Sequence, residues 1–459
     1  MADDHKDLKT SPHALILPYP SQGHINPLLQ FAKRLAYHGL RSTLAIPRSI
    51  LGSTEPETGS VHIAVISDGF DKGITDISSV TEYLDKLKSV GSKTLGQLMQ
   101  TESSVGRPVD IVIYDTAVPW GADVARQFGA ATAAFFTQSC AVDTVYGHIW
   151  EGKLEMPVRA EFIQLTGSRL LEQEDLPSFI LQPDADAYPT YVVILTKQFL
   201  GLDKADEVLI NSFYELETEE AEYMASVWRA KTIGPTVPSS YLDNHIPSDT
   251  SYGFHVYKPE TAPCMAWLDT KLPNSVVYIS IGSILSLDIR QMAELAYGIF
   301  NSNIPFLWVV RSSEVSKLPE GFADEAKERG LIVSWSPQLD ILAHQAVGCF
   351  LSHCGWNSTI EALSIGVPMV AFPQWTDQPM NASYVESVWE VGVRTRQDSD
   401  RLVRREEIES CVKEVMQGGR SEEYRRNAEK WSNKAKEAMK EGGSSYKNIV
   451  NLVAKYKNN

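Results

Sequence analysis

One stretch of 44 residues, from Trp335 to Gln378, holds the densest set of side chains able to bind a ligand. Its sequence is WSPQLDILAHQAVGCFLSHCGWNSTIEALSIGVPMVAFPQWTDQ. Aromatic and amide groups at its start suit a flat base, and a glycine-containing loop in its middle suits phosphates. A carboxylate beside an amide at its end suits a sugar ring. This order along the chain indicates a site for a nucleotide sugar.

The loop HCGWNS connects a predicted strand over residues 348–353 to a predicted helix over residues 357–366. Free backbone N–H groups and the helix dipole attract an anion at such a helix start. Asn357 and Ser358 are also ordinary helix N-cap residues, and both interpretations can hold because a phosphate would occupy the same helix end. Glu361 falls in the first turns, where a carboxylate can accept hydrogen bonds from ribose hydroxyls or simply complement the dipole.

The two ends of the stretch carry the other candidate ligand groups. Trp335 ends the apolar strand LIVSW and can offer a flat face to a base, although a buried core tryptophan is the more common role. Gln338 adds an amide edge. Gly355 lets a backbone approach a ligand closely, although a glycine in a tight turn needs no ligand to explain it. Asp377 and Gln378 stand side by side after a strand, a pairing that suits a polyhydroxylated ring better than a core.

Metal, ATP and dinucleotide chemistry are not indicated. A zinc site would have to use His344, Cys349, His353 and Cys354, which lack repeated short-spaced pairs and flank an apolar strand. The chain has no GxxxxGK[ST] loop and no GxGxxG after its first strand, which counts against an NTPase or a dehydrogenase.

A second candidate centre lies more than 200 residues upstream. His24 follows the first strand, HALILP, and precedes a helix expected to begin near Pro27. Such a place disfavours the imidazolium and suits a base that starts neutral, although a lone histidine is more often a hydrogen-bonded structural residue. Asp115 ends the strand IVIYD and can bind the other ring nitrogen, fixing the tautomer.

The elements that must position these groups alternate as strands and helices in both halves of the 459 residues, which predicts two α/β domains. The first domain begins with a Rossmann-like parallel sheet. The same order of strand, glycine turn and helix starts again at SVVYISIGS, after a polar stretch. We expect an N-terminal domain over 1–240, a linker over 241–260, a C-terminal domain over 261–440 and a C-terminal helix over 441–459 that packs back on the N-terminal domain.

Charge and composition narrow the partners. The formal net charge is −16 without a large basic cluster, so nucleic acid and anionic membranes are poor partners. The acidic start does not resemble a signal peptide, and no apolar run reaches the roughly 18 residues of a membrane span, so we expect a cytoplasmic protein. Five scattered cysteines fit reduced thiols rather than a disulfide framework.

With WxPQ at its start, HCGWNS in its middle and DQ at its end, the 44-residue block resembles the signature box of plant secondary-product UDP-glycosyltransferases. The resemblance extends over nearly the whole chain. It implies a GT-B fold, two facing Rossmann-like domains with parallel sheets, in which the C-terminal domain holds the UDP-sugar and the N-terminal domain mainly holds the acceptor. It also points to the subgroup that glucosylates small acids, phenols and terpenoid or steroid alcohols.

The resemblance further implies a role for each matching residue. Trp335 stacks on uracil, the Ser336 backbone and Gln338 meet the base and ribose, and Glu361 binds ribose hydroxyls. The diphosphate and sugar are assigned to Ser283, His353, Gly355, Trp356, Asn357, Ser358, Asp377 and Gln378. Gln378 is similar to the last residue of glucose-using members. Ile281, where relatives commonly have Phe, departs from the pattern and can reshape the acceptor wall, whereas Ser336 in place of Ala acts through its backbone.

The implied reaction is an inverting transfer from UDP-glucose in which the pair His24 and Asp115 serves as general base, yielding a β-glucoside with no cofactor and no metal. A UDP-sugar-binding protein without transferase activity, a UDP-sugar hydrolase and an epimerase are the alternatives. The acceptor itself is not readable. Its pocket is expected near Ser21, Tyr146, Phe199, Leu285 and Trp375. We expect a monomer.

Overall fold

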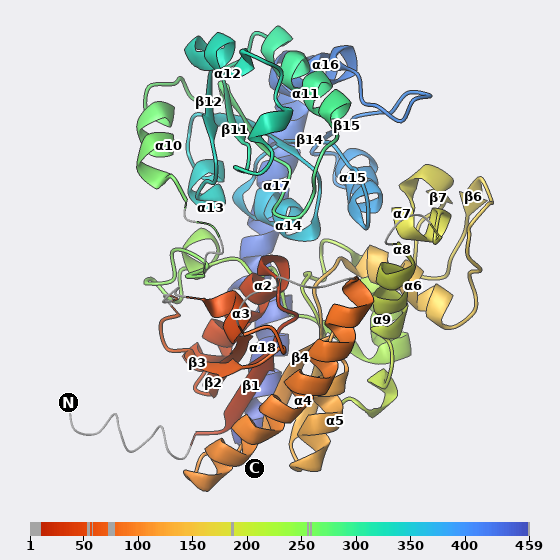
Figure 1. Ribbon diagram of the computed structural model, residues 1–459, viewed down its shortest axis with the longest axis vertical. Coiled ribbons are helices and arrows are strands. Elements are labelled where there is room, and N and C mark those ends of the chain that lie inside the picture. Colours follow the sequence, from red (N-terminus) through yellow and green to blue (C-terminus); the bar gives the residue numbers. More distant parts are fainter. Residues whose placement is uncertain are drawn as a thin grey trace. The chain divides into compact units, whose positions relative to one another are not determined.

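The computed structural model describes residues 11–52, 56, 58–71, 79–184, 188–254, 257 and 259–457. The chain forms two compact units, which Figure 1 colours by sequence. Unit 1 comprises Met1–Gln173, Phe179–Val256 and Lys436–Asn459. Unit 2 comprises Glu174–Ser178 and Tyr257–Ala435.

Within the described residues, unit 1 is built on a seven-stranded sheet in the order β3-β2-β1-β4-β5-β8-β9, with every pair parallel. The central strands are short apolar runs buried along their whole length, as expected for strands covered on both faces. The strands are β1 (His13–Leu17), β2 (Arg41–Pro47), β3 (His62–Ile66), β4 (Ile111–Asp115), β5 (Ala131–Phe136), β8 (Glu207–Ile210) and β9 (Ala230–Thr232), and β6 (Phe162–Ile163) and β7 (Leu171–Glu172) form a separate antiparallel pair.

Helices cover this sheet because right-handed crossovers place them on opposite faces as the strand order reverses. Helix α2 packs against α18, and α4 packs against α5 (Figure 1). The helices are α2 (Gln22–Tyr37), α3 (Arg48–Leu51), α4 (Val80–Ser104), α5 (Trp120–Gln127), α6 (Cys140–Trp150), α8 (Tyr188–Lys197), α9 (Thr218–Trp228) and α18 (Ser444–Lys457), and residues 179–181 of α7 (Ser178–Leu181) also belong to unit 1.

Unit 2 repeats the design on a six-stranded parallel sheet, counted within the described residues, in the order β12-β11-β10-β13-β14-β15. Ile279, Trp308 and Leu351 belong to its buried core. The strands are β10 (Val276–Ser280), β11 (Phe306–Val309), β12 (Gly330–Val333), β13 (Val347–Ser352), β14 (Met369–Ala371) and β15 (Gly392–Arg394). The helices are α10 (Thr261–Leu268), α11 (Ile289–Asn301), α12 (Phe322–Glu325), α13 (Gln338–Leu342), α14 (Trp356–Ile365), α15 (Gln378–Ser387), α16 (Arg405–Gln417) and α17 (Ser421–Met439), whose last four residues belong to unit 1.

Each of the two parallel sheets has one point where the strand order reverses. In unit 1 it lies between β1 and β4, and in unit 2 it lies between β10 and β13. In open parallel sheets, ligands bind outside the carboxyl ends of the strands at such a switch point. The strand order alone therefore marks one ligand-binding edge in each unit.

Residues 241–260 are predicted to be a linker, and the structure places residues up to 254 within unit 1. Two buried ion pairs tie this segment to α2: Lys33 Nζ lies 2.6 Å from Asp249 Oδ1, and Arg34 donates to Asp243. The predicted C-terminal helix corresponds to α18 of unit 1, where Asn448 Nδ2 donates to the carbonyl of Thr232 at 2.8 Å.

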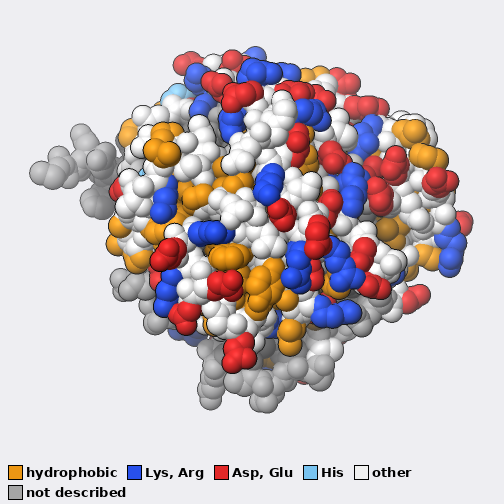
Figure 2. Space-filling model, turned by 90° about the horizontal axis from the view of Figure 1, so that it is seen from above, with side chains coloured by type: hydrophobic (Ala, Val, Ile, Leu, Met, Phe, Trp, Pro, Cys, Tyr) orange, Lys and Arg blue, Asp and Glu red, His pale blue; other side chains and the backbone are white. Residues whose placement is uncertain are grey.

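The surface seen in Figure 2 mixes acidic and basic side chains with scattered apolar ones. On its described part, that face shows no broad positive patch of the kind that binds nucleic acid. Among the described helices, none is long and apolar enough to cross a membrane.

Candidate functional site

His24 and Asp115 meet at the switch point of unit 1. Nδ1 of His24 lies 2.6 Å from Oδ2 of Asp115. The carboxylate is fully buried and also accepts the backbone N–H of Ala117 at 2.9 Å, whereas the imidazole is 30% exposed. Because the carboxylate holds Nδ1, Nε2 is the ring atom positioned to take a proton from a ligand.

Helix α2 begins earlier than predicted. It starts at Gln22 rather than near Pro27, so His24 lies in its first turn instead of in the preceding loop. Pro27 is inside the helix, and the glycine four residues before it, Gly23, has no side chain to add to the crowding that a proline ring causes. The imidazole therefore lies beside the free backbone N–H groups at the N-terminus of α2.

In unit 2, an aromatic pair stands where a base is expected. Trp335 follows β12, is partly buried and lies with its ring 4.7 Å from that of Tyr257. Glu260 holds the segment before it: its carboxylate accepts both the backbone N–H and the hydroxyl of Ser334, and its own N–H donates to the carbonyl of Trp335. The flat indole is thus kept at the strand end.

A hydrogen-bonded chain connects Gln338 to Glu361. Gln338 Nε2 donates to Glu361 Oε2 at 2.7 Å and to Ser358 Oγ at 3.0 Å. The buried hydroxyl of Tyr278 on β10 donates to Gln338 Oε1 at 3.1 Å and lies 2.9 Å from Ser336 Oγ. The structure therefore brings together the amide and the carboxylate that sequence assigned to a ribose, and it adds Tyr278 as their support.

The loop HCGWNS leads directly into the N-terminus of α14. The helix begins at Trp356 with Gly355 as N-cap, so the expectation that Asn357 and Ser358 act as N-caps is wrong. Both lie inside the first turn. Cys354 has φ of 63°, a left-handed conformation that turns the backbone sharply ahead of the helix. The first backbone N–H groups of α14 are thereby presented at the edge where β10 and β13 end.

His353 lies between two glycines of this edge. A Cβ built on Gly282 or on Gly355 would lie 2.6 Å from its Nε2, so only glycine fits at both positions. Burial lowers the pKa of His353 to about 4, against a smaller opposite effect of a backbone hydrogen bond with Ser280. The ring is therefore neutral near pH 7 and can give an N–H to an anion at the helix end.

The pKa of His353 has a consequence for stability. Its folded-state pKa lies below the ordinary value of 6.5, so the unfolded chain binds a proton more readily between pH 6.5 and 4. Stability should therefore fall as the pH drops through this window, by up to about 3 kcal/mol. Thermal midpoints of wild type and His353→Asn, measured from pH 7.5 to 4.5, should converge as the pH falls; parallel curves would show that His353 carries no linked proton.

Gly355→Ala should weaken binding of UDP about tenfold, because the added Cβ displaces the His353 imidazole at the start of α14. Titration calorimetry with UDP measures the change. Gly419→Ala is the matched control, since a Cβ there meets nothing within 4 Å. Equal UDP affinity in both variants would contradict a diphosphate at this helix end.

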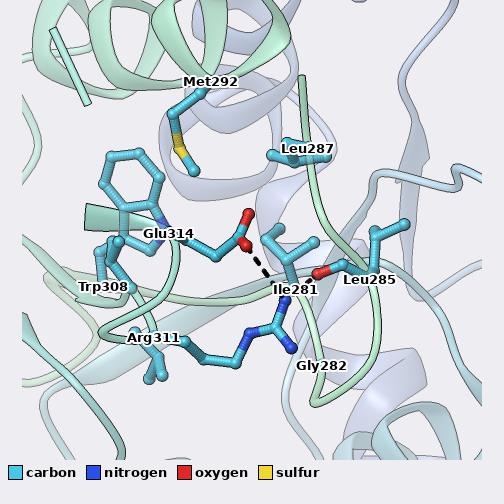
Figure 3. A pocket seen from close by; sticks show the side chains of 10 residues that line it. Ile281, Gly282, Leu285, Leu287, Met292, Trp308, Arg311 and Glu314 are labelled. Atoms are coloured by element: carbon cyan, nitrogen blue, oxygen red, sulfur yellow. Dashed lines mark hydrogen bonds and ion pairs between the residues drawn. The ribbon is translucent and has the colours of Figure 1, made fainter. Parts of the chain in front are cut away.

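The loop after β10 carries Ser283, and the side chain of Arg311 holds its backbone. Arg311 donates to the carbonyls of Ser283 and Leu285. It also pairs with Glu314 in a pocket lined mostly by apolar residues, and Figure 3 draws its contacts with Leu285 and Glu314. Ile281 lines the same pocket. Arg311 thus holds the backbone of the loop in one shape beside His353.

Asp377 and Gln378 are buried at the N-terminus of α15. Gln378 Oε1 accepts the backbone N–H groups of Gln374 and Trp375, which leaves its amide NH₂ as the end that can turn to a ligand. Asp377 accepts from Thr376 Oγ1 and from Asn381 Nδ2, at 2.5 and 2.7 Å. Burial raises the pKa of its carboxyl, and these hydrogen bonds oppose the rise.

The residues expected around the acceptor fare differently. Tyr146 and Phe199 are only 1% and 2% exposed, and Phe199 packs on Phe136 and Trp228, so these two are core side chains in the structure. An aromatic-rich stretch without periodicity does not distinguish a core from a cleft. Ser21, directly before α2, and Leu285 and Trp375 of unit 2 are partly buried and remain candidates.

Several supporting residues escaped sequence reasoning. Tyr19 lies edge-on to His24 with ring centroids 5.2 Å apart, and Thr137 Oγ1 lies 3.3 Å from the same Nδ1 that Asp115 holds. The sequence pattern indicated only a core strand position for Tyr278, and no pattern pointed to a role for Thr376. In the part of the chain that the structure describes, no group of three or more His, Cys, Asp or Glu side chains could hold a metal ion.

Comparison with known proteins decides the family. A family profile described as "UDP-glucoronosyl and UDP-glucosyl transferase" matches residues 190–438. Crocetin glucosyltransferase 2 of Crocus sativus is 49% identical over 443 residues, which cover 96% of each chain. Flavonol 7-O-beta-glucosyltransferase UGT74F1 of Arabidopsis thaliana is 45% identical and covers 96% of this chain and 98% of its own. The chain belongs to the plant UDP-glycosyltransferase family.

Solved structures agree with this membership. Os79 from O. sativa in complex with UDP is 47% identical, with a TM-score of 0.91 over 96% of this chain and all of its own. A second Os79 structure, with U2F and trichothecene, has a TM-score of 0.87 at the same identity and coverage. The predicted GT-B fold and enzyme class are confirmed. This UDP-glycosyltransferase transfers a sugar from a UDP-sugar to a small metabolite.

Proposed function

We propose that this UDP-glycosyltransferase is an inverting glucosyltransferase that uses UDP-glucose and makes β-glucosides of small lipophilic acceptors. The observation that carries the proposal is the 2.6 Å pair of His24 and Asp115 at the switch point of unit 1. A partly exposed imidazole whose Nδ1 is held by a buried carboxylate is the arrangement that a general base needs.

In the proposed reaction, Nε2 of His24 takes the proton of an acceptor hydroxyl. The acceptor oxygen attacks the anomeric carbon of UDP-α-glucose from the side opposite the diphosphate. The bond from that carbon to the diphosphate oxygen breaks, and UDP leaves with the electron pair. Asp115 stabilises the imidazolium that forms, because its carboxylate accepts from Nδ1.

Unit 2 is proposed to bind the donor along its switch-point edge. Trp335 faces uracil, Gln338 and Glu361 face the ribose, and Ser283, His353 and the N-terminus of α14 face the diphosphate. The N–H groups there are fixed before the reaction and are aimed where negative charge develops on the leaving group. Asp377 and Gln378 face the sugar hydroxyls, and unit 1 provides most of the acceptor site.

The names of the relatives support the finer assignment. Crocetin glucosyltransferase 2 and flavonol 7-O-beta-glucosyltransferase are both named for glucose, and the second for a β-linkage. Os79 was solved with a trichothecene. We therefore propose that the acceptor is a phenolic, terpenoid or steroid-like metabolite with a hydroxyl or carboxyl group. We also propose that the enzyme is a cytoplasmic monomer. Size-exclusion chromatography with light scattering tests the oligomeric state.

A transfer assay tests the proposal. Purified enzyme is given radiolabelled UDP-glucose, UDP-galactose or UDP-glucuronic acid together with a mixed panel of phenols, terpenoid alcohols and carboxylic acids. We expect label from UDP-glucose to enter acceptor products at least tenfold faster than label from the other donors. A preference for another donor would refute the glucose assignment, and release of free glucose alone would indicate a hydrolase.

A further inference from the structure

We propose that residues Glu174–Ser178, here called the strap, position the side chains at the sugar-binding end of the donor site. The strap thereby sets how tightly and how selectively the sugar part of the donor is bound, and it leaves the affinity for the UDP part unchanged. The inference rests on the proposed function, which assigns Asp377 and Gln378 to the sugar. The strap belongs to unit 2, although the residues before and after it in sequence belong to unit 1. It lies about 160 residues upstream of the signature stretch.

A buried ion pair anchors the strap at one end. Arg394 on β15 donates through Nη1 to Asp175 Oδ1 at 2.8 Å and through Nη2 to Glu174 Oε1 at 3.2 Å. The side chains of Arg394 and Asp175 are only 8% and 4% exposed. Arg394 also lies 3.6 Å from Glu386, so the end of the strap is joined to a buried cluster of charges. Breaking a buried ion pair is strongly destabilising, which makes this a firm anchor.

At its other end the strap grips Thr376. The backbone N–H of Ser178 donates to the carbonyl of Thr376 at 2.9 Å, and the backbone N–H of Thr376 donates to Ser178 Oγ at 2.8 Å. Both backbone polar groups of Thr376 are therefore held by one residue. The pairing joins the strap to the residue directly before Asp377.

Thr376 adopts a conformation that it would not hold by itself. Its φ is 57°, in the left-handed region that a β-branched residue rarely enters. Such a residue persists where its surroundings over-determine it, and these places are often functional. Here the two hydrogen bonds of Ser178 supply that constraint.

The conformation of Thr376 determines where the sugar-binding groups lie. Its hydroxyl donates to Asp377 Oδ1, and the residues just before it, Gln374 and Trp375, hold the amide oxygen of Gln378 through their N–H groups. A change in the turn at Thr376 would move both the carboxylate and the amide. The groups assigned to uracil, ribose and diphosphate are held by separate contacts, such as Tyr278 to Gln338. Loosening the strap should therefore affect the sugar and spare UDP.

Ser178→Ala tests this inference in the full-length protein. The variant loses the Oγ that accepts from Thr376 and keeps the backbone bond, so it should fold. Calorimetry with UDP-2-fluoroglucose, a donor that is not transferred, should show binding weakened at least fivefold, while binding of UDP changes less than twofold. The KM for UDP-glucose should rise, and the rate ratio of UDP-glucose to UDP-galactose should fall.

Ser432→Ala is the matched control, because it also removes a serine hydroxyl that makes a hydrogen bond with the backbone of unit 2. The Ser432 hydroxyl is buried and donates to the carbonyl of Ser364 at 2.7 Å, whereas Ser178 is partly buried. It should leave both affinities unchanged. If Ser178→Ala weakened the binding of UDP and of UDP-2-fluoroglucose equally, or weakened neither, the proposed role of the strap would be wrong. A wild type that binds UDP-2-fluoroglucose no better than UDP would instead overturn the sugar assignment of Asp377 and Gln378, and the inference with it.

Discussion

Replacing His24 by alanine should lower kcat for transfer of glucose to a hydroxyl acceptor by about 10³-fold, because the imidazole proposed to take the acceptor proton is then missing. This loss corresponds to about 4 kcal/mol of transition-state stabilisation. The affinity for UDP should stay within twofold, since the residues assigned to UDP belong to unit 2. Single-turnover rates with saturating UDP-glucose and a phenol, together with calorimetry of UDP, measure both quantities.

Two controls make the result specific. His24→Gln keeps a polar side chain beside Asp115 but no base, so it should be as slow as the alanine variant. His38→Ala removes a histidine from the other end of the same helix and should keep the wild-type rate. A carboxylic acid acceptor is already ionised near neutral pH, so its transfer should fall much less in His24→Ala. Near-normal turnover of the phenol by His24→Ala would refute the base assignment.

Asp115→Asn should lower kcat by about 10²–10⁴-fold while leaving the His24 ring in place. The carboxylate accepts from Nδ1 at 2.6 Å, which keeps the proton on Nδ1 and the lone pair on Nε2. An asparagine that turns its NH₂ group toward Nδ1 reverses the tautomer and places a hydrogen on Nε2, where it cannot accept the acceptor proton. The amide also cannot stabilise an imidazolium as a carboxylate does.

Thr137→Ala gives the control for Asp115→Asn. Its hydroxyl lies 3.3 Å from the same Nδ1, but it carries no charge and is not needed to fix the tautomer, so the rate should fall less than tenfold. Rates of phenol glucosylation are measured from pH 6 to 9 for the wild type, Asp115→Asn and Thr137→Ala. If Asp115→Asn and Thr137→Ala slowed the reaction equally, Asp115 would be only one of several packing contacts around the ring.

The sequence predicted those parts of the site that depend on local order. Trp335, Gln338 and Glu361 fall within 27 residues of one another, and strand, loop and helix periodicity placed them on neighbouring elements. The contact between Gln338 and Glu361 at 2.7 Å fits that placement. The pairing of His24 with Asp115 followed from two strand ends that a parallel sheet brings to one edge.

Other features depended on contacts that local patterns do not encode. Phe199 was expected near an acceptor, and in the structure it packs on Trp228. A sequence rich in aromatic residues does not show whether their surface is buried in a core or in a cleft. The start of α2 at Gln22 was missed because the proline at position 27 suggested a first-turn residue. The bridge between Ser178 and Thr376 joins residues 198 apart, and nothing in either local sequence predicts it.

The configuration of the glucoside tests the central claim most directly. Wild-type enzyme is incubated with UDP-α-glucose and a simple phenol, and the anomeric proton of the product is followed by nuclear magnetic resonance from the first turnovers while UDP is quantified. Direct displacement with His24 as base predicts a β-glucoside from the outset, with one glucoside formed for each UDP released. An α-glucoside, or UDP released with free glucose in place of glucoside, would contradict it.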